Sequence, residues 1–203
     1  MQVIQLVNTF YTSNTYVLSY EGSPYVWLVD CGDYVSQVRP LLQSRCVRGI
    51  LLTHTHSDHI YGIKDVLADF PNVRIYTNEF GSMALGDSKL NLSRYHTEVP
   101  RLEIEDRGNV ITVDEGDDIE LFEGFYGKVL STPGHDKSCL SYMIGKYVFT
   151  GDSYIPGIKV KASFPHSNRM DAKATYKRLE IISQKNYVCP GHGSCLDKQK
   201  TSF

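Results

Sequence analysis

Four side chains able to bind a metal ion lie within six residues of one another, directly after an apolar run. Residues 49–53 read Gly-Ile-Leu-Leu-Thr, and residues 54–59 read His-Thr-His-Ser-Asp-His. Imidazole and carboxylate are the ligands that zinc and non-haem iron prefer in proteins. The stretch therefore predicts a metal site at the end of a buried strand.

Three further metal-binding residues occur singly, and each follows an apolar, strand-like run through a short turn. His135 follows Ser-Thr-Pro-Gly, Asp152 follows Val-Phe-Thr-Gly and His192 follows Val-Cys-Pro-Gly. Because strand ends are rigid and loops at one sheet edge can converge, we expect all these side chains to meet. Seven ligands are enough for two adjacent metal ions that share one carboxylate.

The ordered set resembles the metallo-β-lactamase superfamily over nearly the whole chain, from Asn14 to Gly193. The HxHxDH motif and the later His, Asp and His of that family are matched in order by His54, His56, Asp58, His59, His135, Asp152 and His192. The resemblance implies an α/β fold, a four-layer αββα sandwich with the metals at one edge. The chain length suits a single domain over residues 1–203.

The resemblance also implies how the ligands are shared between two Zn²⁺ ions, with iron or manganese as alternative metals. His54 and His56 can reach one ion together from an extended loop, and His135 completes its protein ligands. Asp58, His59 and His192 are assigned to the second ion, and Asp152 bridges the two. In this family Asp58 would also accept a proton from the nucleophile.

Asp30 and Gly32 match an Asp-x-Gly that the family often carries at the end of an early strand. A carboxylate there can accept a hydrogen bond from a ligand histidine and fix its tautomer, which is the role we expect for Asp30 and for Asp33. An ordinary turn carboxylate is the alternative. The candidate substrate contacts are Tyr154, Lys159 and His166, for which core packing or a solvated loop is the simpler account.

Composition excludes several classes of function. A net charge of −2 gives no reason to expect nucleic acid or an anionic membrane as partner. No apolar run is long enough for a transmembrane helix, and the first residues lack the features of a signal peptide. The five cysteines are odd in number and show no disulfide spacing, which favours a reducing cytoplasm. We therefore expect a cytoplasmic protein with a small-molecule substrate, and the oligomeric state is open.

Apolar patterning predicts a chain rich in strands. Strands are expected at 3–7, 15–20, 25–29, 47–52, 73–77, 110–113, 119–122, 128–131, 139–144, 147–150 and 187–189. Helices are expected at 35–43, 60–70 and 170–184, the second of them stopped by Pro71. Segment 78–109 shows no clear period, and residues 85–94 within it are expected to form loop with a helical turn.

The leading functional hypothesis is a dinuclear zinc hydrolase that is similar to glyoxalase II and acts on a thioester. Asp87, Asn91, Leu92 and Ser93 match an Asp-x-x-x-Asn-Leu-Ser segment of small hydrolases of that group. Full-length glyoxalase II carries a C-terminal helical domain that holds glutathione, whereas this sequence ends soon after His192. Another ester, a lactone or a phosphoester is therefore left open as substrate.

Two other classes of function stay open. A persulfide dioxygenase-like protein would hold one iron with His54, His135 and Asp152 and leave positions for oxygen. A non-catalytic metal sensor is disfavoured, because an incompletely ligated site suits catalysis better than structure. β-Lactam hydrolysis is less favoured, since many such enzymes have a cysteine where Asp152 stands.

Overall fold

The first of two β-sheets contains the N-terminal half of the chain. The computed structural model describes residues 1–98 and 100–195. In spatial order, the first sheet consists of β1 (Gln2–Val7), β2 (Asn14–Ser19), β3 (Tyr25–Val29), β4 (Cys46–Leu51), β5 (Arg74–Thr77) and β6 (Val110–Thr112). The strands β1, β2 and β3 pair antiparallel, whereas β3 to β6 pair parallel. Parallel pairing brings the carboxyl ends of β3, β4 and β5 to one edge.

The second sheet contains the C-terminal half. In spatial order it consists of β11 (Tyr187–Pro190), β10 (Tyr147–Gly151), β9 (Leu140–Ile144), β8 (Phe125–Ser131) and β7 (Asp118–Phe122). Only the pair of β10 and β11 is parallel among these strands. The strands β8, β10 and β11 consequently run in one direction and end at a common edge.

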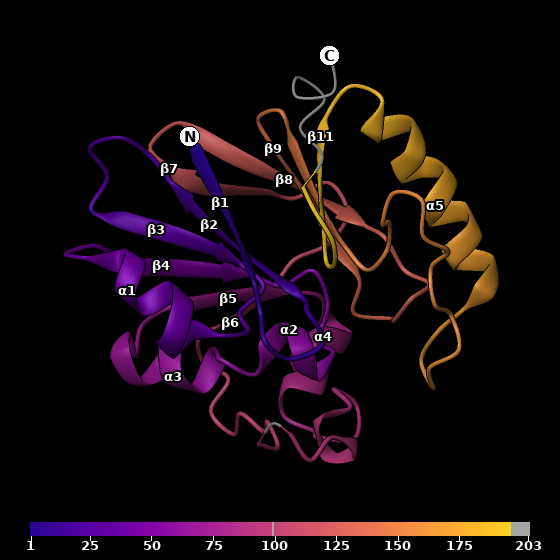
Figure 1. The fold of residues 1–203 in the computed structure, drawn as a ribbon, viewed down its shortest axis with the longest axis horizontal. Helices are drawn as coiled ribbons and strands as arrows, with labels where there is room; N and C mark the ends of the chain where they lie inside the picture. The colour runs from indigo at the N-terminus through magenta and orange to yellow at the C-terminus, as the bar shows by residue number, and fades with distance from the viewer. Residues whose placement is uncertain (99, 196–203) are drawn as a thin grey trace.

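Helices cover the outer faces of both sheets, as Figure 1 shows. The helices α1 (Arg39–Leu42) and α3 (Ile63–Asp69) lie on the first sheet, and α5 (Arg169–Ser183) lies along the second. This arrangement confirms the predicted α/β αββα sandwich. No helix within the described residues combines the length and apolar character needed to span a membrane.

The alternation of side chains along β3 explains how one strand serves two cores. Trp27 and Val29 pack in the layer between the sheets, where Leu51 and Phe149 are also buried. Val26 and Leu28 pack in the layer between the first sheet and its helices. Because successive strand residues face opposite ways, a strand buried on both faces reads as one continuous apolar run.

The predicted helix 60–70 is wrong in one respect, because two short helices replace it. These are α2 (Ser57–Ile60) and α3, separated at Gly62. Gly62 N donates a hydrogen bond to Cys31 O, and a Cβ on Gly62 would lie 2.1 Å from Gly32 O. The end of β3 therefore packs directly on the break, where only glycine fits.

A second difference is α4 (Glu79–Leu85), which lies in segment 78–109, where only a helical turn within 85–94 was expected. Its first turn is capped by Asn78, whose side chain accepts a hydrogen bond from Gly81 N. The predicted helical turn is present as η2 (Ser93–Tyr95). The helix was missed because its seven residues are too few to show a clear helical period.

The Asp-x-x-x-Asn-Leu-Ser segment organises the loop that follows α4. The Asn91 amide donates to the carbonyls of Ala84 and Leu102, at 2.8 and 2.9 Å. Ser93 N donates to Asn91 Oδ1, and Leu102 N donates to Ser93 Oγ. Through these buried hydrogen bonds, the segment joins the end of α4 at Ala84 to the chain at Leu102.

Candidate metal centre

The predicted ligands all gather at the edge where strands of both sheets end. His54 and His56 lie between β4 and α2, and Asp58 and His59 lie within α2. The remaining three come from the second sheet. His135 lies between β8 and β9, Asp152 directly follows β10, and His192 lies just after β11.

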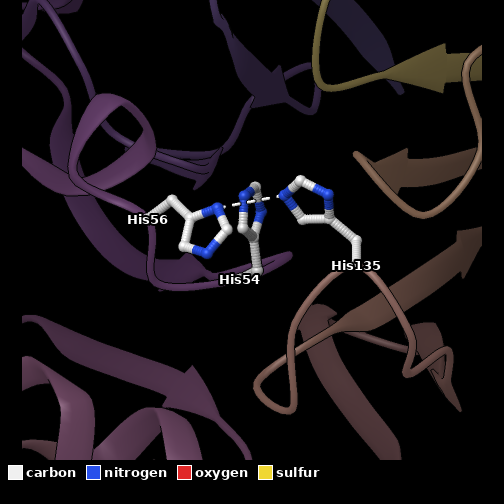
Figure 2. Close-up of side chains that lie close together, drawn as sticks. All are labelled: His54, His56 and His135. Atoms are coloured by element: carbon white, nitrogen blue, oxygen red, sulfur yellow. Dashed lines mark hydrogen bonds between the residues drawn. The ribbon is translucent and has the colours of Figure 1, made fainter. Parts of the chain in front are cut away.

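His54, His56 and His135 form the first group of ligand atoms. These atoms lie within 4.8 Å of one another, and all three side chains are buried. The Nε2 atom of His135 is 3.0 Å from Nδ1 of His56. Figure 2 shows His135 entering from a different loop than His54 and His56, with its ring directed toward theirs. Three nitrogens that converge in this way suit one cation.

Asp58, His59 and His192 form the second group, again with ligand atoms within 4.8 Å of one another. The Asp58 Oδ2 atom lies 3.4 Å from Nε2 of both histidines. His59 is fully buried, whereas the His192 side chain is 23% exposed. The second group therefore faces the solvent-accessible side of the cluster.

Asp152 lies between the two groups. Its Oδ2 atom is 3.6 Å from His135 Nε2 and 3.4 Å from His192 Nε2. Its Oδ1 atom is 3.6 Å from His59 Nε2. One carboxylate thus contacts a member of the first group and two members of the second, which is the placement that a shared ligand needs.

Polar atoms left without hydrogen bonds test whether these residues fit metal ions. Among the described residues, Nε2 of His54, Nε2 of His59 and Oδ1 of Asp152 are buried and have no hydrogen-bond partner. Leaving a buried polar atom unpaired costs about 1–3 kcal/mol, and more for a charged group. Nitrogen and carboxylate donors are the set that divalent zinc and iron bind. The residues therefore fit divalent cations.

Hydrogen bonds on the other ring nitrogens orient these histidines. Nδ1 of His135 donates to Lys161 O at 2.8 Å, and Nδ1 of His59 donates to Asp30 Oδ2 at 2.9 Å. His54 Nδ1 lies 3.2 Å from Thr53 Oγ1, whose hydroxyl donates to Asp30. With Nδ1 protonated, the lone pair of each ring belongs to Nε2, the atom that faces the cluster.

Asp30 is placed to support two ligands at once. Its carboxylate is buried and accepts hydrogen bonds from Thr53 N, from the Thr53 hydroxyl and from His59. Its ligand atoms also lie near those of His54 and His59. Because both oxygens already accept hydrogen bonds, the geometry favours orientation of histidines over direct metal binding.

The two groups differ in their affinity for protons. Burial, reinforced by neighbouring imidazoles, lowers the pKa of His54 well below its usual value, and burial lowers the pKa of His135 to about 4. Burial also acts to lower the pKa of His59 and His192, but nearby carboxylates outweigh it. The pKa values of these two rings rise to about 9 and about 10.

The carboxylates of the cluster stay ionised. Burial acts to raise the pKa of Asp58, but His59 and His192 hold the pKa below its usual value. The same balance, with His135 added, lowers the pKa of Asp152 further. Negative charge is therefore kept between the two groups, where it favours cations.

Asp136 is a site residue that the sequence analysis missed. Its Oδ2 atom lies 3.7 Å from His56 Nε2, on the side of the ring away from His135. Its Oδ1 atom accepts hydrogen bonds from Ser138 N and Ser138 Oγ. The available signal was its position directly after His135, since a carboxylate beside a ligand can orient another ligand.

Phe164 and Lys161 form part of the wall of the site and were not among the candidate contacts. The Phe164 ring lies 4.8 Å from the His56 ring and 5.3 Å from the His135 ring. Lys161 Nζ lies 4.4 Å from the centroid of Phe164. The position of Phe164 in the loop that follows the ligand Asp152 was the signal that could have marked this wall.

The three candidate substrate contacts lie in different surroundings. Tyr154 is buried, its ring packs against Tyr176, and its hydroxyl lies 3.5 Å from Ser183 Oγ on α5. The structure thus places Tyr154 in the core beside α5 and does not bring it to the histidine cluster. Lys159 is exposed. His166 is half-buried, with its ring 5.1 Å from that of Phe80.

The comparisons with known proteins agree on one family. The model of the metallo-beta-lactamase superfamily matches residues 8–192. A probable metallo-hydrolase of Streptococcus pyogenes serotype M6 is 28% identical over 215 residues, covering 100% of this chain and 90% of that protein. A hydroxyacylglutathione hydrolase of Yersinia pestis is 26% identical over 187 residues, covering 87% of this chain. The chain spans 64% of that enzyme, which is less than two thirds of its length.

A solved structure shows the same fold. The protein TTHA1623, crystallised in a di-iron-bound form, matches with a TM-score of 0.79 at 24% sequence identity. The match covers 96% of this chain and 94% of that chain. The likeness therefore extends over both sheets and the helices that cover them.

Proposed function

Because the chain belongs to the metallo-β-lactamase superfamily, we propose that it is a hydrolase that uses two divalent cations to cleave a thioester of a small thiol. One observation carries the proposal. The Asp152 carboxylate lies between the group of three histidines and the group of Asp58, His59 and His192. A carboxylate in that position suits a ligand shared by two cations.

In this proposal His54, His56 and His135 hold one cation, and Asp58, His59 and His192 hold the other. Zinc is the proposed metal, because nitrogen and carboxylate donors without thiolate suit it, and iron or manganese are the alternatives. The di-iron form of TTHA1623 supports the use of a metal pair in this fold. Asp30 is proposed to orient His59 directly and His54 through Thr53.

When bound, such a pair supplies a water of lowered pKa and positive charge for a developing oxyanion. The protein's own side chains hold the cations and limit the access of water. His54 and His135 are kept neutral by burial, so their lone pairs are available at neutral pH. Phe164 covers His56 and His135 and limits the access of bulk water from that side.

Asp58 is proposed as the residue that moves a proton during hydrolysis. Its carboxylate is ionised and its side chain is 13% exposed, so it faces both the cluster and the entering substrate. The hydrogen bond that His192 makes to Asp58 keeps that carboxylate oriented toward the second group. An ionised carboxylate beside the attacking water can accept its proton as the carbon–oxygen bond forms.

The substrate class rests on the relatives. The Yersinia pestis protein is named a hydroxyacylglutathione hydrolase, and the thioester carbonyl of such a substrate is the electrophile that this site could polarise. The chain spans only part of that enzyme, so the proposal names the class of small-thiol thioesters rather than glutathione alone. An acyl thioester of another small thiol fits the same chemistry.

A mononuclear iron dioxygenase on His54, His135 and Asp152 is the second candidate. It would leave the group of Asp58, His59 and His192 without a role in metal binding, and the Nε2 atom of His59 would then stay buried without a hydrogen-bond partner. It would also leave His56 unused, although His56 Nδ1 lies 3.0 Å from His135 Nε2. Two cations account for more of these contacts than one.

The test is a substrate panel with a defined metal load. The full chain, loaded with zinc and checked for metal content, is assayed on a hydroxyacyl thioester of glutathione, a lactone, a phosphodiester and a β-lactam. The proposal expects two zinc ions per chain and fastest turnover of the thioester. Protein purified without added metal that holds one iron per chain and takes up oxygen in a thiol-dependent manner would overturn it, and so would zinc-loaded protein that cleaves another substrate of the panel and no acyl thioester of a small thiol.

A further inference from the structure

Two cysteine sulfurs lie in contact on either side of the ligand His192. The Sγ atoms of Cys189 and Cys195 are 3.0 Å apart. Cys189 is the third residue of β11 and is buried, whereas Cys195 is partly exposed. Five residues separate them along the chain, and His192 is the middle one. Cysteine spacing did not predict this pair, because the contact depends on the turn that follows β11.

Hydrogen bonds from the first sheet hold this turn in place. The Asn14 side chain donates to the carbonyls of Pro190 and Gly193, at 2.9 and 2.8 Å. The Gln5 side chain donates to Gly193 O, and Cys195 N donates to Gln5 Oε1 at 2.9 Å. The backbone on both sides of His192 is thereby fixed, and the two sulfurs are held near each other.

We propose that Cys189 and Cys195 form a reversible disulfide, produced by a hydroperoxide, that closes a ring around His192 and couples retention of metal to thiol oxidation. A disulfide bond is about 2.05 Å long, so the sulfurs need to approach by only about 1 Å. Side-chain rotation can supply that movement while the hydrogen-bonded backbone stays in place. The inference goes beyond the proposed hydrolysis and does not depend on it.

The chemistry balances with one peroxide per disulfide. The Cys195 thiolate, on the accessible side, attacks the peroxide oxygen and becomes a sulfenic acid while hydroxide leaves. The Cys189 sulfur then attacks the Cys195 sulfur, and the S–S bond forms as water leaves. In sum, two thiols and one peroxide give one disulfide and two waters. A thiol reductant reverses the reaction.

Contact with Cys195 and burial explain which sulfur reacts first. Both effects raise the pKa of the Cys189 thiol well above its usual value, so Cys189 keeps its proton. That thiol can donate its proton toward Cys195 Sγ across the 3.0 Å contact. Cys195 is therefore the better nucleophile and Cys189 the residue that resolves the sulfenic acid.

Ring closure would affect His192 by restricting how the turn opens. His192 can leave a bound cation when segment 190–195 moves away from Asp58 and Asp152. A covalent link between the ends of that segment removes many of the open conformations. We therefore expect the oxidised protein to release metal several-fold more slowly than the reduced protein.

The test uses the metal-loaded full chain and mass spectrometry. After treatment with hydrogen peroxide, remaining thiols are alkylated under denaturing conditions, and the protein is digested. The proposal expects a peptide that joins Cys189 to Cys195, lighter by two hydrogen atoms than the reduced pair and restored by dithiothreitol. Cys31 and Cys139 are buried, so their thiols should escape the peroxide and be recovered in alkylated form. The linkage is read by mass and requires neither substrate nor turnover.

Matched variants separate the outcomes. Cys46→Ser removes the exposed cysteine that competes for peroxide and should leave the linkage unchanged. Cys195→Ser should abolish the linkage and make metal loss to a competing chelator equally fast before and after peroxide. Full alkylation of Cys189 and Cys195 at peroxide levels that oxidise Cys46 would overturn the proposal. A linkage that leaves the rate of metal loss unchanged would overturn the coupling to His192.

Discussion

The Asp30 carboxylate lies 2.9 Å from Nδ1 of His59, a residue 29 positions later in the chain. Both residues are buried, and the same carboxylate also accepts a hydrogen bond from the hydroxyl of Thr53, the residue before His54. One carboxylate therefore supports a histidine from each of the two groups. Its removal should affect both cations, although Asp30 is proposed to bind neither.

Asp30→Asn tests this support. The amide cannot offer an anionic acceptor on both oxygens, so His59 and His54 lose orientation and basicity. We expect metal affinity to fall about 10- to 100-fold, measured by competition with a chromogenic chelator. Asp33→Asn is the matched control, because the Asp33 carboxylate accepts hydrogen bonds from Thr9, Gln37 and Tyr61 and from no proposed ligand. The expectation that Asp33 also orients a ligand histidine is therefore wrong. Equal metal affinity in Asp30→Asn and wild type would refute the role.

Asp58→Asn tests proton transfer. The amide keeps the size of the side chain but cannot accept the proton, so kcat on the best thioester should fall about 10²- to 10⁴-fold. Metal content is measured in the same preparation, because Asp58 is also a proposed ligand. Loss of turnover with both cations retained supports the catalytic role. If wild type itself turns over no ester or thioester, a metal sensor becomes the better account.

Gly191→Ala tests how closely the turn after β11 approaches the cluster. A Cβ on Gly191 would lie 2.2 Å from Asp152 Oδ1 and 3.0 Å from His59 Cε1. The methyl group would displace the shared carboxylate, so we expect loss of at least one cation per chain by metal analysis. Gly86→Ala is the control, because its nearest neighbours are 3.6 Å away. Full metal content in Gly191→Ala would show that the turn at Gly191 does not lie close enough to Asp152 to displace it.

Asp33 gives a prediction for the pH dependence of stability. Burial acts to raise its pKa, but hydrogen bonds from Tyr61, from Thr9 N and Oγ1 and from Gln37 lower it below its ordinary value of 3.8. A folded-state pKa below the unfolded value means that the carboxylate stabilises the fold above the unfolded pKa. That contribution is lost as pH falls through the folded pKa.

Asp33→Asn should therefore lower the free energy of unfolding at pH 7 by about 1–2 kcal/mol, a value reduced for partial exposure of the carboxylate. The difference from wild type should shrink below the ordinary pKa of aspartate. Urea unfolding of both proteins at several pH values, with metal removed, measures it. A difference that stays constant down to strongly acidic pH would contradict the assignment.

The strands and the ligand cluster could be predicted because the chain repeats one local pattern. Each ligand follows an apolar strand and a short turn, and strand ends that share a direction share an edge, as β8, β10 and β11 do. The break at Gly62 could not be predicted, because it depends on the approach of Gly32 O from a distant strand end. Asp136 was missed although its position directly after His135 offered a signal. The Cys189–Cys195 contact was missed because it depends on the turn after β11, which hydrogen bonds from the first sheet hold in place.

The placement of ligands on both sheets has a consequence for how the protein acquires its metal on the ribosome. His54, His56, Asp58 and His59 are made early, but the second sheet supplies His135, Asp152 and finally His192. A nascent chain that ends before residue 192 can offer the first set of donors but lacks one member of the second. Loading of the proposed pair must therefore wait until translation has passed residue 192.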